Sequence, residues 1–181
     1  MGNKKISTGS LPSWLTRIFL QTDTHLGHER MIEFGIVRDF ENRIFKGLKV
    51  LTPEDIFIHL GDICIGNDEG YHLNYVLKIP CKKILVRGNH DKKTISWYLQ
   101  YWDFVCDSFS LEVYGKKILF SHVPFPPQKE LYDFNIHGHC HIKEPLRKDK
   151  IYPYYDEKYH KLLSLEKLDY QLIQLKTFLG L

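Results

Sequence analysis

The sequence predicts an α/β sandwich that contains a mixed sheet or a pair of sheets. Two observations support this fold class. Short apolar runs alternate with amphipathic stretches in the first half of the chain, and β-rich runs joined by turns dominate the second half. Strand–helix units followed by antiparallel strands are typical of such a sandwich. With 181 residues, 43% of them hydrophobic, the chain is long enough to bury the core of one domain.

Three apolar runs in the first half end in polar clusters, as buried strands do. They are TRIFLQTD (16–23), DIFIHLGD (55–62) and KKILVRGNHD (82–91). Helices are expected after each of these strands, because the segments that follow them have helical spacing. The first helical region extends to about Val50, and the other two cover EGYHLNYVLKI (69–79) and KKTISWYLQYW (92–102).

The second half of the chain has the pattern of strands joined by turns rather than of strands alternating with helices. SLEVYGKKILFSH (110–122) predicts a hairpin, because Gly115 separates two β-rich arms. DFNIHGHCHI (133–142) is another strand-like run, and KLLSLEKLDYQLIQL (161–175) can supply one or two more strands. Loops are expected at VPFPPQKEL (123–131) and at the basic, tyrosine-rich segment 143–159.

Composition narrows the class of protein. The net charge of +3 is too small to indicate nucleic-acid binding, although it suits an anionic substrate. Four cysteines without paired spacing predict reduced thiols and a cytoplasmic location, and no apolar run approaches the roughly 20 residues of a membrane span. Ile6 stands where a myristoylation signal has Ser or Thr. Residues 1–15 are therefore expected to form a polar arm and residues 16–181 a single domain.

Polar residues collect where the predicted strands end. The clusters are Asp23-Thr24-His25, Gly61-Asp62, Gly88-Asn89-His90-Asp91, His122 and Gly138-His139-Cys140-His141. Ligands of α/β proteins collect at the carboxyl ends of strands, so these five clusters can converge on one site. Residues i and i+2 of an extended segment point the same way. Asp23 with His25, and His139 with His141, are therefore each expected to act as a two-pronged clamp.

The donor types point to metal ions. Imidazole nitrogens with carboxylate and amide oxygens suit Mn, Fe, Ni or Zn. These donors exceed what one tetrahedral ion needs, so two metals fit better than one, as in sites that clamp both oxygens of an in-line displacement. Each motif alone has an ordinary explanation, such as a helix N-cap for DTH or an Asn-containing loop for GNHD. The ordered set of five favours a metal site.

The ordered set D-x-H, G-D, G-N-H-D, a lone H and G-H-x-H, within residues 16–142, resembles the calcineurin-like metallophosphoesterase superfamily. TDTHLGH and HLGD look most like its small single-domain prokaryotic and phage members. The resemblance implies a four-layer αββα sandwich with two mixed β-sheets flanked by helices. It also implies two metal sites, one held by Asp23, His25 and His141, the other by Asn89, His122 and His139, with Asp62 bridging both.

The resemblance further implies a mechanism. A hydroxide that bridges the metals would be the nucleophile, and His90 would be the general acid. Asp91 would orient His90. His28 is a further candidate, on weaker grounds, for a residue that contacts the phosphate. Mn²⁺ is the expected metal, with Fe, Ni or Zn as alternatives. His137 is expected beside the ligands rather than among them. His59 is expected to be an ordinary surface or core histidine, with a place beside the ligands as the alternative. The tyrosines at 152, 154, 155 and 159 could stack on a base, but packing is the preferred interpretation.

The expected substrate is a phosphate ester, with a phosphodiester preferred over a monoester. An alkoxide leaving group gains from acid assistance by His90, and the short chain has no further domain to build a deep monoester pocket. Cyclic nucleotides, nucleotides and short oligonucleotides are candidates. The alternatives are a phosphomonoesterase acting on nucleotides or phosphoproteins, and a catalytically silent binding scaffold. The oligomeric state is not predicted.

Overall fold

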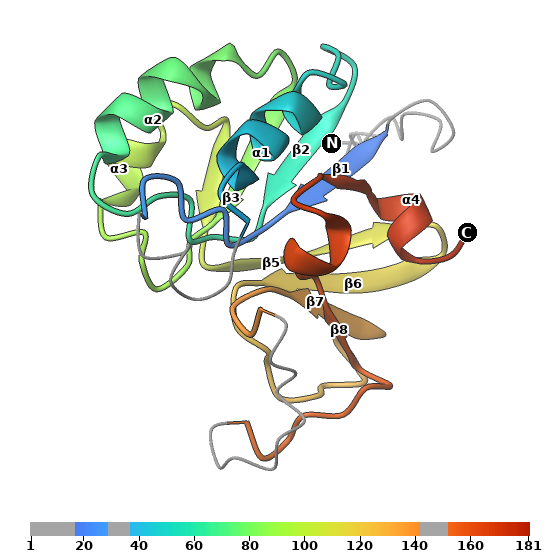
Figure 1. The fold of residues 1–181 in the computed structure, drawn as a ribbon. Coiled ribbons are helices and arrows are strands. Elements are labelled where there is room, and N and C mark those ends of the chain that lie inside the picture. Colours follow the sequence, from blue (N-terminus) through green and yellow to red (C-terminus); the bar gives the residue numbers. More distant parts are fainter. Residues whose placement is uncertain (1–16, 29–36, 142–151) are drawn as a thin grey trace, which may run out of the picture.

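The computed structural model describes residues 17–28, 37–141 and 152–181 (Figure 1). The expected N-terminal arm, part of the first helical region and most of the basic loop lie outside the described residues. The described chain forms two β-sheets with helices beside them. The predicted α/β sandwich with two mixed sheets flanked by helices is confirmed.

The larger sheet has five strands in the order β4-β3-β2-β1-β9. Its strands are β1 (Ile18–Gln21), β2 (Ile56–His59), β3 (Lys82–Val86), β4 (Phe104–Cys106) and β9 (Ile173–Gln174). The first four are parallel, and β9 runs antiparallel to β1. The first three correspond to the predicted apolar runs. The sequence did not predict β4, because three residues are too few to show a strand period.

The smaller sheet has the order β5-β6-β7-β8. Its strands are β5 (Ser108–Val113), β6 (Lys116–Ser121), β7 (Phe134–His137) and β8 (His160–Leu162). The predicted hairpin is confirmed as the antiparallel pair β5–β6, and β6, β7 and β8 are parallel. Tyr114 (φ 53°) and Gly115 (φ 69°) both adopt left-handed backbone at its tip, which matches the twist of a hairpin.

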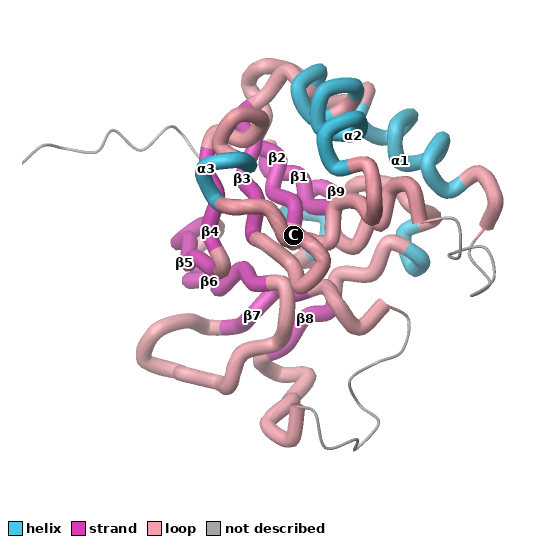
Figure 2. The backbone as a smooth tube through the Cα atoms, turned by 90° about the vertical axis from the view of Figure 1, so that its left-hand side faces the viewer, coloured by secondary structure: helices cyan, strands magenta, loops and turns pink. Residues whose placement is uncertain are grey.

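Helices α1 (Phe40–Leu48), α2 (Asp68–Asn74) and α3 (Ile95–Tyr98) lie on one side of the larger sheet (Figures 1 and 2). They confirm the expected helices in shortened form, and a 3₁₀ turn, η2 (Val76–Lys78), continues from α2. Asn67 and Thr94 cap α2 and α3 by accepting bonds from the backbone N–H groups of Gly70 and Trp97. The C-terminal segment adds η3 (Glu166–Leu168) and α4 (Leu175–Phe178).

Two hydrophobic cores lie on opposite faces of the larger sheet. Phe19 of β1 packs with the residues of the helical core, whereas Ile18 and Leu20 belong to the core shared with the smaller sheet. This alternation explains why Ile18, Phe19 and Leu20 are all apolar, since a strand covered on both faces needs apolar residues on each face. Among the described residues, no helix is both long and apolar enough to cross a membrane.

Candidate metal centre

Five loops meet beyond the carboxyl ends of β1, β2, β3, β6 and β7. The loop after β1 runs beside the loop after β2, with Asp23 N donating to Gly61 O at 2.9 Å and His25 N to Asp62 O at 3.0 Å. Gly138 N donates to His122 O at 3.0 Å, which joins the loops after β6 and β7. His139 N donates to the Asp23 carboxylate at 2.9 Å and so connects the two sheets. The predicted convergence of the five clusters is therefore what the fold produces.

One group of donors consists of Asp23, His25 and His141, whose candidate ligand atoms all lie within 4.8 Å of one another. His25 Nε2 lies 3.9 Å from Asp23 Oδ1, and the His25 and His141 rings stack with centroids 5.2 Å apart. The Oδ1 atom of Asp23 is buried and has no hydrogen-bond partner among the described residues, while its Oδ2 accepts from Thr22 and His139. A buried carboxylate oxygen without a partner is costly, and a cation would satisfy it.

The second group consists of Asp62, His122 and His139, with Asn89 beside them. His122 Nε2 lies 3.0 Å from Asn89 Oδ1, 3.1 Å from His139 Nδ1 and 3.4 Å from Asp62 Oδ2. Metal–ligand bonds of about 2.1 Å place neighbouring ligands of one ion about 3 Å apart, so this spacing fits a shared metal. The other nitrogen of His122, Nδ1, donates to Leu60 O at 2.7 Å and leaves Nε2 free to bind.

Asp62 connects the two groups through a single oxygen. Its Oδ2 lies 3.9 Å from His25 Nε2 in the first group and 3.4 Å from His122 Nε2 in the second. Its Oδ1 accepts the backbone N–H of His90 at 2.7 Å, which holds the carboxylate in place. One anion between two donor groups is the arrangement that a metal-bridging carboxylate requires, so the residues fit a dinuclear site.

Charge within the site is strongly coupled before any metal binds. Burial opposes the ionised form of Asp62, but the hydrogen bond and charge of His122 lower its pKa to about 2. Burial also opposes the charged form of His122, but the hydrogen bond to Asp62 outweighs it and raises the pKa of His122 to about 9. Burial lowers the pKa of His25 to about 4 and raises that of Asp23. A proton on His122 competes with a metal for Nε2, so metal affinity should rise with pH.

The clamps are not extended, which corrects the sequence interpretation. β7 ends at His137, and His139 (φ 66°) and His141 (φ 49°) follow it in left-handed backbone. Asp23 (φ 47°) and His25 (φ 41°) are left-handed as well, beyond the end of β1. Alternation along a strand therefore does not bring these side chains together. Left-handed backbone turns Asp23 and His25 into the same donor group, whereas it turns His139 and His141 toward different ones.

Two glycines let the loops approach the carboxylates closely. A Cβ atom on Gly88 would collide with the carboxylate and backbone of Asp62, and one on Gly138 would collide with Thr22 and the Asp23 carboxylate. Any side chain at either position would displace a candidate ligand. The glycines of the GNHD and GHCH motifs are thus required by sterics at the site itself.

The residues expected to act on the substrate occupy different surroundings. His90 has a 46% exposed side chain, with Nε2 4.0 Å from Asp62 Oδ2 and its ring 5.5 Å from that of His25. His28 lies next to His25, with ring centroids 6.1 Å apart. His90 is thus open to solvent at the edge of the donor groups, where a substrate oxygen can reach it.

Asp91 has different partners from those expected. Its Oδ2 accepts from Gly88 N at 2.7 Å and Asp62 N at 2.9 Å, and its Oδ1 accepts from Ile63 N at 3.1 Å. Within the described residues, none of its hydrogen bonds goes to His90. Asp91 therefore connects the loops after β2 and β3. The expectation that it orients His90 is not supported by any hydrogen bond between the two described residues. Burial raises its pKa to about 6.

The structure shows what two supporting residues contact. His59, for which a place beside the ligands is the alternative in the sequence analysis, accepts from Gly61 N and contacts Thr24 Oγ1, which donates to Ile63 O. It therefore joins the loops after β1 and β2. Glu166, which the sequence analysis did not single out, accepts a 2.6 Å hydrogen bond from His141. Glu166 lies in the leucine-rich run of residues 161–175, and nothing in that pattern indicates that its carboxylate reaches a residue 25 positions earlier.

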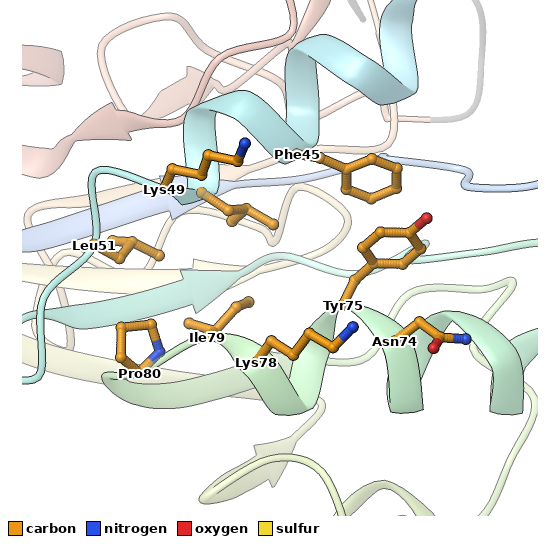
Figure 3. A pocket seen from close by; sticks show the side chains of 9 residues that line it. Phe45, Lys49, Leu51, Asn74, Tyr75, Lys78, Ile79 and Pro80 are labelled. Carbon is orange, nitrogen blue, oxygen red and sulfur yellow. The ribbon is translucent and has the colours of Figure 1, made fainter.

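Two other features lie apart from the centre. A third group of possible donor atoms, all within 4.8 Å of one another, comes from Cys64, Asp68 and His72. Cys64 already donates to Asp68 Oδ1, and His72 Nδ1 donates to Asp68 O. Burial also strongly raises the pKa of the Cys64 thiol, which disfavours the thiolate that would bind a metal. A cavity of about 410 Å³ lies between α1 and the α2–η2 segment, with Lys49 and Lys78 beside an apolar wall (Figure 3). None of the candidate metal ligands lines that cavity.

Comparison with known proteins agrees with this geometry. Residues 16–173 match the calcineurin-like phosphoesterase family. The crystal structure of a protein of unknown function from Aquifex aeolicus is 31% identical, with a TM-score of 0.73, over 91% of this chain and 98% of that one. No curated protein matches the sequence.

Two more distant structures are also similar in part. A novel archaeal phosphodiesterase is 20% identical over 68% of this chain and 72% of its own, with a TM-score of 0.42. A predicted phosphoesterase from Streptococcus pneumoniae is 18% identical over 69% and 62%, with a TM-score of 0.36. Because the family match spans most of the chain and the motifs that predicted it meet at one place in the fold, this protein belongs to the calcineurin-like phosphoesterase family.

Proposed function

We propose that the protein is a phosphoesterase that depends on two divalent metals, with Mn²⁺ the preferred ion and Fe, Ni or Zn as alternatives. Asp23, His25 and His141 would hold one ion, Asn89, His122 and His139 the other, and Asp62 both. The observation that carries the proposal is the position of Asp62 Oδ2, within 3.9 Å of a histidine nitrogen from each donor group. Family membership agrees, since its members act on phosphoric esters at divalent metal sites.

When bound, two such ions supply Lewis acidity that activates water and neutralises developing charge on the phosphoryl group. The protein's own residues position the donor groups and transfer the proton. Asp62 fixes the separation of the donor groups, and His122 is held by Leu60 O so that Nε2 faces inward. His90 carries a proton on its exposed ring to the departing oxygen, and its backbone N–H anchors Asp62. His28 would contact the phosphoryl oxygens from beside His25.

We further propose that phosphodiesters are preferred to monoesters. The exposed position of His90 supports this, because an open site admits groups on both sides of the phosphorus. A nucleotide-derived diester, such as a cyclic nucleotide or a short oligonucleotide, is the proposed substrate class. The protein would act in the cytoplasm, in keeping with its four free cysteines.

The experiment compares hydrolysis of bis-p-nitrophenyl phosphate and p-nitrophenyl phosphate, with Mn²⁺ and with a chelator. We expect Mn²⁺-dependent cleavage with a higher kcat/KM for the diester. Asp62→Asn should lose both metals and the activity, since the bridging charge is gone. Glu112→Gln, which removes an exposed carboxylate on β5, is the matched control and should behave as the wild type.

Each other result has a distinct meaning. Faster cleavage of the monoester would replace the diester preference with a phosphomonoesterase. A fully metallated and active Asp62→Asn variant would refute the bridging role. If two ions bind but neither ester is cleaved, and cyclic nucleotides and oligonucleotides also remain intact, the silent binding scaffold becomes the better account.

A further inference from the structure

Glu166 makes a direct contact with one of the candidate metal ligands. Its Oε1 lies 2.6 Å from His141 Nδ1, and its Oε2 accepts a 2.8 Å hydrogen bond from Ser164 Oγ. A carboxylate at this distance only accepts, so Nδ1 of His141 carries the hydrogen. The bare nitrogen of His141 is then Nε2, the atom left to bind a metal.

The chain holds Glu166 firmly in this position. Leu163 and Leu165, two residues apart, are buried in the two different cores on either face of the larger sheet. The backbone carbonyl of Leu165 accepts from Leu168 N at 3.0 Å and Tyr170 N at 2.8 Å, which closes the turn of η3. The side chain of Glu166 is only 11% exposed. The carboxylate is thus fixed before any metal arrives.

His141 needs such a partner more than the two buried histidine ligands, His25 and His122, do. Its side chain is 31% exposed, compared with 6% for His25 and 4% for His122. Packing therefore restricts its ring less, and the hydrogen bond to Glu166 must select both ring orientation and tautomer. Carboxylates that receive the second N–H of a metal-bound histidine also make the other nitrogen a stronger ligand.

We propose that Glu166 is a positioning residue for the metal held by Asp23, His25 and His141, acting through Nδ1 of His141. This inference rests on the proposed dinuclear site. Glu166 itself contacts neither metal nor substrate in this role. It makes the C-terminal segment, which lies outside the motifs at 16–142, a functional part of the centre.

The test measures metal binding rather than turnover. Mn²⁺ is titrated into metal-free wild type, Glu166→Ala, Glu166→Gln and the control Glu157→Gln, an exposed glutamate in the same C-terminal region. Glu166→Ala should weaken one of the two ions 10–100-fold and leave the other unchanged. Glu166→Gln should lose less, because its amide oxygen still accepts from Nδ1. The control should match the wild type.

Two further readouts separate positioning from a general structural effect. In a His141→Ala background, Glu166→Ala should cause no further loss of affinity, because the two residues act through one contact. Long-range ¹H–¹⁵N NMR of the metal-free protein should show His141 protonated at Nδ1 in the wild type and a mixture of tautomers in Glu166→Ala. If Glu166→Ala does not fold, Glu166→Gln carries both measurements.

The possible failures are distinguishable. Two ions bound with unchanged affinity in the Glu166 variants, or an equal loss in the His141→Ala background, would overturn the positioning role and leave the proposed function intact. A wild type that binds fewer than two ions would overturn the proposed dinuclear site and this inference together.

Discussion

Left-handed backbone marks the metal centre residue by residue. Five of the seven candidate ligands have φ between 41° and 66°, namely Asp23, His25, Asp62, His139 and His141. Non-glycine residues in this region cost on the order of 1–3 kcal/mol each, so they persist only where surrounding contacts impose them. Such strain concentrated on the residues with donor atoms is expected of a site built for binding rather than for stability.

At this scale we predict the effect of His90→Asn. The variant should retain both metals, because His90 holds Asp62 through its backbone N–H and not through its ring. Its kcat should fall by roughly 10²–10⁴, the usual contribution of a general acid. Turnover of a cyclic nucleotide, whose alkoxide leaving group needs a proton, and metal content by elemental analysis measure the two effects. Turnover near that of the wild type would exclude His90 from proton transfer.

At the scale of elements, the loops matter more than the strands. The strands end at Gln21, His59, Val86, Ser121 and His137, before the candidate ligands begin. Hydrogen bonds between loops then set the geometry, including the three backbone donors to Asp91 and the chain from His59 through Thr24 to Ile63. The sheets bring the loops near one another, and these contacts aim the donors.

Gly138→Ala tests this dependence on close approach. The added Cβ would collide with Asp23 and Thr22, so we expect metal affinity to fall at least tenfold and the free energy of unfolding by about 1–3 kcal/mol. Gly115→Ala is the control. The added Cβ at Gly115 would meet open space, so metal binding should not change. The left-handed φ of 69° at this position should still lower the free energy of unfolding by about 1–2 kcal/mol. Normal metal binding by Gly138→Ala would contradict the steric argument.

For the whole molecule, burial of histidine makes stability depend on pH. Burial lowers the pKa of both His59 and His137 to about 3. The unfolded chain binds these protons near pH 6.5, so unfolding takes up protons between about pH 6.5 and 3, and stability falls as the pH falls. Asp91, whose pKa burial raises to about 6, acts in the opposite direction.

We therefore predict how the slope of unfolding free energy against pH differs between a variant and the wild type, rather than the slope itself. Urea unfolding of the metal-free protein at pH 6, 5 and 4 should give a shallower loss of stability for His137→Gln than for the wild type. The two slopes should differ by up to about 1.4 kcal/mol per pH unit, the contribution of one proton. Equal slopes would mean that His137 is protonated in the folded protein.

Much of the centre could be predicted from the sequence, because donor types and strand ends are local features. The apolar runs located β1, β2, β3 and β7, and the order of the motifs identified the family. The sequence could not locate β4, whose three residues show no period. Alternation also predicts the wrong backbone geometry for Asp23, His25, His139 and His141, because an alternating pattern does not show where the strand ends.

The order and donor types of the motifs identify the candidate ligands and suit two metal ions. The folded protein adds the direction of those donors, the backbone N–H partners of Asp91 and the contact of Glu166 with His141. These features could not be predicted because the contacts join residues that lie far apart along the chain. The contact between His139 and Asp23 spans 116 residues, and it exists only because two sheets pack against each other. Periodicity reports each strand's neighbours in sequence and carries no information about such a pairing.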